Sequence, residues 1–319
     1  MQIKDPQNIL RSVLDEGPEK LTLEISGIQT EMRLLVASDL HCNFDDERGI
    51  PFQQYTARMN RCSVHRFFLL EDAIQQARQG LCDAILLPGD LLSFPSAAGV
   101  EKFAEIINGA PVPCLFTAGN HDWHYEGMPG PEKDLRAEWI GRLLRPLYGT
   151  KDPLMYAETV KGLKFLVIDN STYEILPEQL EFLKKELTEN VPAVLVCHIP
   201  LYVPGRSIFF GCGHPDWNAA NDPYFEIERR ERWRAEGHTE TTMEFYRTVM
   251  GSPRIAGIIA GHIHRYSLDL YAGKFQAVAP NDRLLEIKVQ RGGVQSTRFI
   301  GRLNCADACL PPVFSFQGA

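Results

Sequence analysis

Several short apolar runs along this chain end in compact polar clusters, and this repeated pattern restricts the possible fold more than any other feature. The runs are rich in β-branched residues, as buried strands are. Because parallel strands end at one edge of their sheet, the residues that follow them meet in one crevice. The clusters supply Asp, Asn and His side chains, which suit divalent ions such as Mn, Fe and Zn. They are Ser38-Asp39-Leu40-His41, Gly89-Asp90, Gly119-Asn120-His121-Asp122, Cys197-His198 and Gly261-His262-Ile263-His264.

The spacing of the apolar residues predicts an α/β fold. Runs typical of strands alternate with segments of helical periodicity, which indicates crossover connections and a mainly parallel sheet. Strands are predicted at 21–25, 32–37, 84–87, 114–117, 163–168, 193–196 and 255–260, and helices at 65–79, 97–107, 132–145 and from Pro177 onward. Near the C-terminus, residues 284–290 and 294–300 flank Arg291-Gly292-Gly293, a pattern that predicts an antiparallel hairpin.

We expect one domain over residues 1–319, because no linker, repeat or low-complexity tract interrupts the chain. The segment 205–247 departs from the strand–helix alternation and is rich in Gly, Pro, Trp and charged residues. Loops of this length in compact domains tend to be functional. We therefore interpret the segment as an inserted loop-and-helix excursion over the C-terminal edge of the sheet.

Composition and charge exclude some classes of protein. The net charge of −8 argues against a nucleic-acid-binding surface, which needs a basic excess, but a bound metal pair would still attract a phosphate group. No apolar stretch approaches the ~18 residues of a membrane span. The N-terminal residues show no signal peptide, and several of the eight cysteines lie in or beside apolar runs. A cytoplasmic protein with reduced thiols is the expectation.

The spacing within the clusters suggests metal ligation. Asp39 and His41 are two residues apart, so both face one side if the strand geometry continues, and the same holds for His262 and His264. Asp90 follows a glycine, which permits a sharp exit from the strand. With Asn120 and His198 the potential donors exceed the needs of one ion that also keeps water sites open. Two ions about 3.5–4 Å apart, bridged by a carboxylate, would use them all.

The ordered motifs D-x-H, G-D, G-N-H-D, a strand-end H and G-H-x-H resemble those of the calcineurin-like metallophosphoesterase family. The resemblance implies an α/β sandwich of two mixed β-sheets flanked by helices, with antiparallel C-terminal strands. His121 matches the residue that approaches the leaving oxygen as a proton or hydrogen-bond donor. The side chains that match the family's ligands are Asp39, His41 and His264 for one ion, Asn120, His198 and His262 for the second, and Asp90 as the bridge.

Departures from the family's motifs narrow the subfamily. At the corresponding positions, protein phosphatases have the motifs G-D-x-V-D-R-G and G-N-H-E. This chain instead continues after Asp90 as Leu91-Leu92-Ser93-Phe94, and it has Asp122 in place of the Glu. The missing Arg disfavours a protein phosphatase. The runs Asp169-Asn170-Ser171 and Cys197-His198-Ile199-Pro200 look more like the purple-acid-phosphatase-like and cyclic-nucleotide-phosphodiesterase-like branches. No Tyr follows Asp90 closely, so the iron site of the purple enzymes is not expected. Asp122 either orients His121 or caps the next turn.

The sequence thus predicts hydrolysis of a phosphodiester or small phosphomonoester by metal-bound hydroxide, with two divalent ions (Mn, Fe or Zn) as cofactors. The expected partner is a small-molecule phosphoester, with no nucleic acid and no membrane. The alternatives are a broad-specificity or protein phosphatase, a nuclease and a non-catalytic scaffold. Asn43 is a candidate for substrate contact or simply a turn residue, and His124 is a candidate for lining the pocket or an ordinary surface residue.

Overall fold

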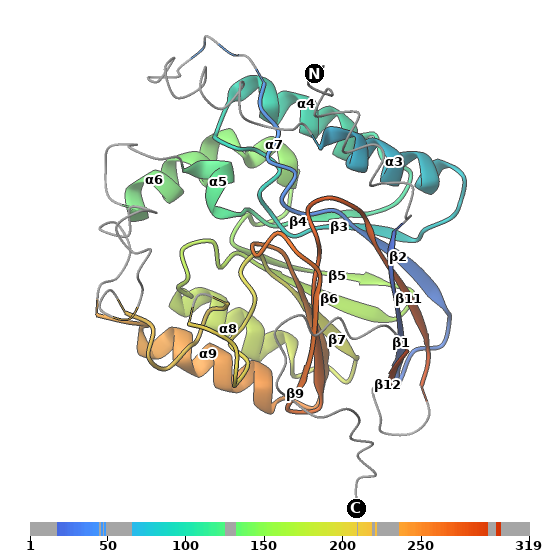
Figure 1. The fold of residues 1–319 in the computed structure, drawn as a ribbon, viewed down its shortest axis with the longest axis vertical. Coiled ribbons are helices and arrows are strands. Elements are labelled where there is room, and N and C mark those ends of the chain that lie inside the picture. Colours follow the sequence, from blue (N-terminus) through green and yellow to red (C-terminus); the bar gives the residue numbers. More distant parts are fainter. Residues whose placement is uncertain are drawn as a thin grey trace, which may run out of the picture.

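Two six-stranded β-sheets stack face to face, and helices cover the two outer faces (Figure 1). In this computed structural model the described residues are 18–44, 46, 48, 66–124, 132–208, 210–218, 221, 236–292 and 298–300. The predicted α/β sandwich of two mixed sheets is confirmed. Both sheets contribute to the core, together with the buried faces of α3 (Phe67–Arg78), α4 (Ala97–Asn108), α8 (Pro177–Glu186) and α9 (Glu240–Gly251).

The first sheet has the strand order β12-β1-β11-β2-β3-β4. Strands β2, β3 and β4 are parallel, and β11 pairs with β2 in the antiparallel sense. All four residues of β3 are buried, as expected for an apolar run covered on both faces. The strands are β1 (Glu19–Ile25), β2 (Met32–Val36), β3 (Ala84–Leu87), β4 (Cys114–Phe116), β11 (Leu285–Arg291) and β12 (Arg298–Ile300).

The predicted hairpin of residues 284–290 and 294–300 is wrong. The N-terminal strand β1 lies between β11 and β12, parallel to the former and antiparallel to the latter. The turn signal at Arg291-Gly292-Gly293 was therefore overridden by pairing with a strand far away in the sequence. The backbone N–H of Gly292 donates to the carbonyl of Ile25, which continues the ladder between β11 and β1.

The second sheet has the strand order β5-β6-β7-β8-β10-β9. Strands β6, β7, β8 and β10 are parallel, and the edge strands β5 and β9 are antiparallel to their neighbours. Every residue of β6, β7 and β8 is buried. The strands are β5 (Met155–Val160), β6 (Leu163–Ile168), β7 (Ala193–Val196), β8 (Ile255–Ala260), β9 (Ser267–Tyr271) and β10 (Lys274–Val278).

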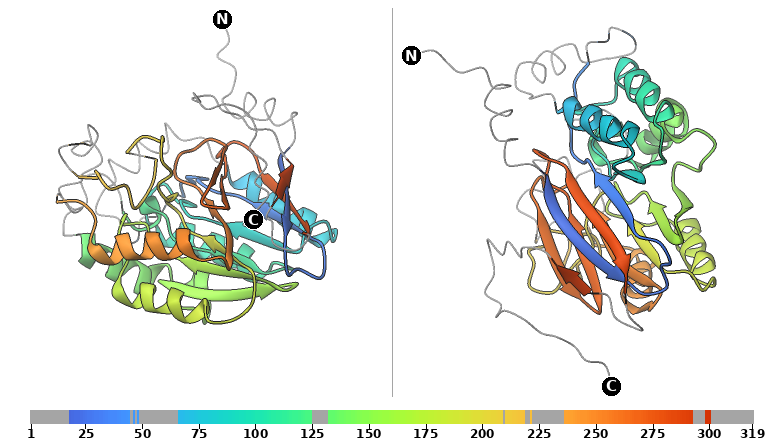
Figure 2. Two further views of the ribbon diagram at one scale, coloured as in Figure 1. Left: turned by 90° about the horizontal axis from the view of Figure 1, so that it is seen from below. Right: turned by 90° about the vertical axis from the view of Figure 1, so that its right-hand side faces the viewer.

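Helices α3, α4 and α7 lie on the side of the first sheet, whereas α8 and α9 lie on the side of the second (Figures 1 and 2). Ser96 and Thr239 cap α4 and α9 by accepting from the backbone N–H three residues on. Pro177 occupies the first turn of α8, where its missing N–H costs nothing. The longer helices are α3 (Phe67–Arg78), α4 (Ala97–Asn108), α8 (Pro177–Glu186) and α9 (Glu240–Gly251).

The helix predicted at 132–145 is divided in the structure. A short α-helix leads into a π-helical turn and then into another α-helical turn that contains Pro146. The proline cannot supply the backbone N–H of a continuous helix, which accounts for the break before α7. These pieces are α6 (Glu132–Glu138), the π-helical Trp139–Leu143 and α7 (Arg145–Tyr148).

The segment 205–247 is described only in part. Its C-terminal residues form the first half of α9, which packs beside α8. Trp217 and His238 from this segment are buried against residues that follow β6. In the described part of the chain, no helix has both the length and the hydropathy that crossing a membrane requires.

Candidate metal centre

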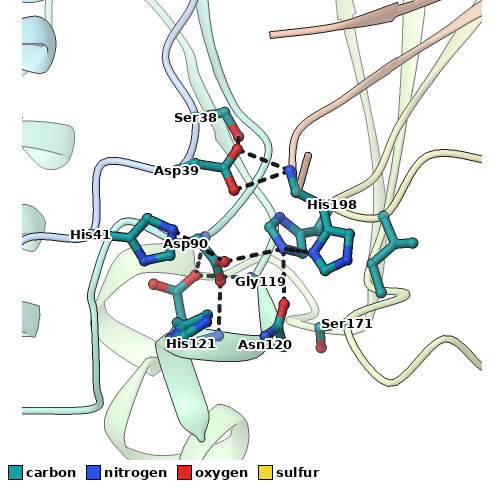
Figure 3. Close-up of polar contacts among 12 residues, drawn as sticks. Ser38, Asp39, His41, Asp90, Gly119, Asn120, His121, Ser171 and His198 are labelled. Atoms are coloured by element: carbon teal, nitrogen blue, oxygen red, sulfur yellow. Dashed lines mark hydrogen bonds and ion pairs between the residues drawn. The ribbon is translucent and has the colours of Figure 1, made fainter. Parts of the chain in front are cut away.

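All five polar clusters predicted from the sequence meet at one place. Figure 3 shows labelled residues of four of them, from Ser38 to His198. Three clusters follow the parallel strands β2, β3 and β4 of the first sheet. The other two follow the parallel strands β7 and β8 of the second sheet. The site is thus built where the C-terminal ends of strands from both sheets face each other.

One group of donor atoms is formed by two carboxylates and two imidazoles. The ligand atoms of Asp39, His41, Asp90 and His264 all lie within 4.8 Å of one another. Nε2 of His41 is 2.9 Å from Nε2 of His264 and 3.7 Å from Oδ2 of Asp90. Nε2 of His264 lies 3.5 Å from Oδ1 of Asp39. This group contains the side chains predicted for the first ion together with Asp90.

The second group surrounds His198. Its Nε2 is 3.1 Å from Oδ1 of Asn120, 3.2 Å from Nδ1 of His262 and 3.3 Å from Oδ2 of Asp90. Nδ1 of His198 lies 2.8 Å from the carbonyl oxygen of Pro88, which can only accept a hydrogen bond. Nδ1 therefore carries a proton, and Nε2 faces three other potential ligands. These are the side chains predicted for the second ion.

The chemistry of both groups fits divalent metal ions. Imidazole nitrogens and carboxylate or amide oxygens converge at distances where their lone pairs repel each other unless a cation lies between them. Asp90 belongs to both groups. The residues present therefore fit a pair of divalent ions, and Asp90 is the side chain that both donor groups share; that it bridges two ions stays a prediction. The family typically binds such a dinuclear centre.

The electrostatics of the carboxylates also favour a cation. Burial raises the pKa of Asp39 and of Asp122 to about 7, and the nearby Asp90 contributes to both rises. Burial acts on Asp90 in the same direction, but the His198, His121 and His41 imidazoles together hold its pKa well below the usual value. Although burial lowers the pKa of His198, the Asp90 carboxylate raises it to about 10. Without a cation, burial thus favours the neutral carboxyl forms of Asp39 and Asp122, and a positively charged group beside them would favour the ionised forms.

The remaining candidate imidazoles are held neutral. Burial lowers the pKa of His41 and of His262 well below the ordinary value. Burial also lowers the pKa of His264 to about 4. A metal-ligating histidine must be unprotonated, so these rings are in the form that binds metal at neutral pH.

Five of the candidate ligands have a backbone conformation that is uncommon for residues with a side chain. Their φ angles are positive: Asp39 +54°, His41 +45°, Asp90 +53°, His262 +74° and His264 +58°. The assumption that extended geometry continues through these pairs was therefore wrong. The left-handed turns direct both members of each pair into the site. Such strain is usually found where function requires it.

Two glycines allow the clusters to approach each other closely. A Cβ atom on Gly119 would overlap the carboxylate and backbone nitrogen of Asp90. A Cβ atom on Gly261 would overlap the side chains of Ser38 and Asp39. The glycines of the G-N-H-D and G-H-x-H motifs are therefore required by the packing of one loop on another.

Asp122 acts within the loops and does not orient His121. Its carboxylate accepts hydrogen bonds from the backbone N–H groups of Gly119, Asp90 and Leu92, at 2.8–2.9 Å. All three donors precede Asp122 in the sequence, so these contacts do not show it capping the following turn either. The ring of His121 faces the carbonyl of Ser93 instead, with 3.2 Å between Nδ1 and that oxygen. Nδ1 is consequently the protonated nitrogen of His121.

Arg66 was missed by the sequence analysis. It precedes α3, and no described residue accepts a hydrogen bond from its buried Nε atom. Burial lowers its pKa, whereas Cys42, Asp282 and Asp39 oppose the shift, so the guanidinium lies in the field of the first donor group. No motif marks this residue, because it lies just before a helix and not at the end of a strand.

The candidate substrate contacts Asn43 and His124 are both buried, with 3% and 4% of their surface exposed. His124 follows directly after α5 and its ring packs on Trp123. Their contact with substrate stays a prediction.

Comparisons with known proteins agree with this geometry. The family model of the calcineurin-like phosphoesterases matches residues 32–266, a range that includes every candidate ligand. No curated protein sequence matches the chain.

Among solved structures, a dimetal phosphatase from Danio rerio is similar, with 13% identity, a TM-score of 0.47, and coverage of 79% of this chain and 88% of that one. A purple acid phosphatase from yellow lupin has 14% identity and a TM-score of 0.47, covering 88% of this chain and 48% of its own. The phosphopantetheinyl hydrolase of Mycobacterium tuberculosis has 12% identity and a TM-score of 0.39, and the match covers 78% of this chain and 89% of that one. The family match over most of the chain shows that this protein belongs to the calcineurin-like phosphoesterase family.

Proposed function

We propose that this protein hydrolyses a phosphodiester or a small phosphomonoester at the paired donor groups. The observation that carries the proposal is the position of Asp90, whose carboxylate belongs to both groups. Divalent ions held there would lower the pKa of water and polarise phosphoryl oxygens. Mn, Fe and Zn all suit the nitrogen and oxygen donors. Asp39, His41 and His264 would hold one ion, and Asn120, His198 and His262 the other.

In this proposal His121 handles the proton of the leaving group. Its backbone N–H donates to Oδ1 of Asp90 at 2.8 Å, which fixes the residue beside the shared carboxylate. Because Nδ1 is held by the Ser93 carbonyl, Nε2 is the ring nitrogen left to exchange a proton with a leaving oxygen. The T-shaped contact between His121 and His41, with 4.8 Å between ring centroids, limits the rotation of the ring.

Arg66 supplies positive charge for the substrate in this proposal. Guanidinium groups bind phosphoryl oxygens with paired hydrogen bonds, and Arg66 is partly buried with its Nε atom unpaired among the described residues. The segment after Asp90 lacks the arginine that protein phosphatases carry there, so Arg66 would bind the phosphoryl group from another part of the chain. The net charge of −8 favours a small phosphoester in the cytoplasm over a nucleic acid.

The proposal is tested by removing metals from the purified protein and restoring Mn²⁺, Fe²⁺ or Zn²⁺ separately. Each form is assayed with bis(p-nitrophenyl) phosphate and with p-nitrophenyl phosphate, and its metal content is measured. We expect two ions per chain and turnover that depends on them. Tight binding of two ions without hydrolysis of either substrate would favour the scaffold alternative. Salt-dependent binding of DNA would favour the nuclease.

A further inference from the structure

One segment braces three of the five ligand-bearing clusters although none of its residues belongs to the donor groups. It consists of residues 169–173 and follows β6. The side chain of Asn170 accepts from the backbone N–H groups of His198 and Ile199. Ser171 accepts from Nε1 of Trp123 in the short helix that carries Asn120. The segment therefore fixes the positions of loops from both sheets relative to one another.

Tyr173 makes the third of these contacts, and it is made to a candidate ligand directly. Its hydroxyl oxygen lies 2.6 Å from Nε2 of His262. The other ring nitrogen of His262, Nδ1, lies 3.2 Å from Nε2 of His198 and so faces the second donor group. The hydroxyl is thus on the side of the ring opposite the site. A group in this place fixes the orientation and tautomer of a metal-ligating histidine.

Tyr173 is itself held in one conformation. It is buried, with a φ of +62°, and its backbone carbonyl accepts from Sγ of Cys212 at 3.1 Å. Its ring stacks on Trp217 with 5.6 Å between centroids and 19° between planes. Trp217 in turn stacks on His238, at 4.7 Å and 17°. The tyrosine therefore cannot turn away from His262 without disrupting a stack of aromatic rings.

The far end of the stack is anchored by hydrogen bonds. Nδ1 of His238 is 2.9 Å from Oε1 of Glu174, and Nε2 of His238 accepts from the backbone N–H of Gly213. The other carboxylate oxygen of Glu174 accepts from the backbone and hydroxyl of Thr239 at the start of α9. Trp217 and His238 both come from the segment 205–247. This segment thus reaches the metal site through packed side chains.

We infer that Tyr173 is a positioning residue for His262 and that it determines how tightly the second donor group holds its metal ion. The inference rests on the proposed two-metal site. The phenol hydroxyl accepts the Nε2 proton of His262, so Nδ1 keeps its lone pair directed toward Asp90 and His198. The stack of Tyr173, Trp217 and His238 gives the latter two residues a structural role in metal binding as well.

The test is the variant Tyr173→Phe, which removes the hydroxyl and keeps the ring that stacks on Trp217. Mn²⁺ is titrated into the metal-free wild type and variant, and binding is followed by calorimetry and electron paramagnetic resonance. We expect one Mn²⁺ ion to bind as in the wild type and the other about 10- to 100-fold more weakly, as for comparable partners of metal ligands. At intermediate Mn²⁺ concentrations the wild type should give the paramagnetic resonance spectrum of a coupled pair of ions, and Tyr173→Phe should give that of a single ion.

Tyr156→Phe is the matched control, because it also removes a buried tyrosine hydroxyl that makes a hydrogen bond of 2.9 Å, here to the carbonyl of Phe116. Its affinities for Mn²⁺ should equal those of the wild type. If the wild type binds two ions and Tyr173→Phe binds both with unchanged affinity, the inference is wrong and the proposed function stands. If both variants weaken Mn²⁺ binding equally, the inference is wrong as well. If the wild type binds fewer than two ions, both the inference and the two-metal function are refuted.

Discussion

Replacing Asp90 by Asn tests the shared carboxylate most directly, because the shape of the side chain is kept and its charge is lost. Oδ1 of Asp90 accepts from the backbone N–H of His121 at 2.8 Å. Oδ2 lies 3.7 Å from Nε2 of His41 and 3.3 Å from Nε2 of His198. An amide NH₂ in place of Oδ1 would face the backbone N–H of His121, which is another donor. In place of Oδ2 it would face the metal ligands. Neither orientation of the asparagine satisfies the site.

The loss in metal affinity follows from the lost charge. Two unit charges about 4 Å apart interact by about 4 kcal/mol at an effective dielectric constant of about 20. Since about 1.4 kcal/mol is a factor of ten, the affinity for each ion should fall at least about a thousandfold. Because Asp90 belongs to both donor groups, both ions are weakened. His264→Ala alters the first group alone, and its side chain is 47% exposed, so it should weaken one ion only.

The assay combines equilibrium dialysis against Mn²⁺, with metal analysis of the retained protein, and turnover of bis(p-nitrophenyl) phosphate. Circular dichroism and the melting temperature of the metal-free forms establish that the variants fold. We expect Asp90→Asn to retain neither ion at concentrations that saturate the wild type and to show no turnover. If it bound two ions within tenfold of the wild-type affinity and hydrolysed the substrate normally, the assignment of Asp90 as the shared ligand would be refuted.

Three further predictions concern groups around the shared carboxylate. His121→Asn should lower kcat by about 10²- to 10⁴-fold while the bound metal remains at two ions per chain, as measured by steady-state kinetics and metal analysis. Arg66→Gln should raise KM by on the order of 10- to 100-fold, the value of a charged hydrogen bond, with Arg66→Lys in between and metal content unchanged. Metal affinity should rise with pH, because binding displaces the proton that His198 holds up to a pKa of about 10. Above pH 7, release of this one proton makes the Mn²⁺ affinity rise about tenfold per pH unit. Below pH 7 the affinity should rise more steeply with pH, because Asp39, with a pKa of about 7, is then also protonated. A Mn²⁺ affinity independent of pH from 6 to 9 would contradict this.

The parallel strands and most of the helices could be predicted because local patterns determine them. The buried runs of β6, β7 and β8 are apolar at nearly every position. This pattern is typical of strands in a sheet that is covered on both faces. The pairing of β1 between β11 and β12 could not be predicted, since it joins residues near the two ends of the chain. In the helix predicted at 132–145, Pro146, just beyond the predicted boundary, accounts for the break before α7, whereas nothing in the structure explains the π-helical turn that begins at Trp139.

The membership of the two donor groups agrees with the sequence motifs, whereas their geometry does not follow from spacing. Alternation along a strand predicts that Asp39 and His41 share a face, but both residues have positive φ angles and reach the site by turning. Tyr173 could not be identified as a partner of His262 because 89 residues separate the two. The nearby run Asp169-Asn170-Ser171 was the available signal, and it pointed to a strand end without indicating which loops it would brace.

The carboxylates of this site serve two purposes at once, and this has consequences for any mutation within it. The carboxylate of Asp39 accepts from the backbone N–H of His262 while facing His264, and Asp90 accepts from that of His121 while facing His198. Four of the five loops that carry candidate ligands are therefore tied in pairs through a carboxylate that is itself a candidate ligand. Removing one such side chain both deletes a ligand and frees the backbone that positions the next. Effects of double substitutions across these loops should consequently depart from additivity, because the residues act as one unit.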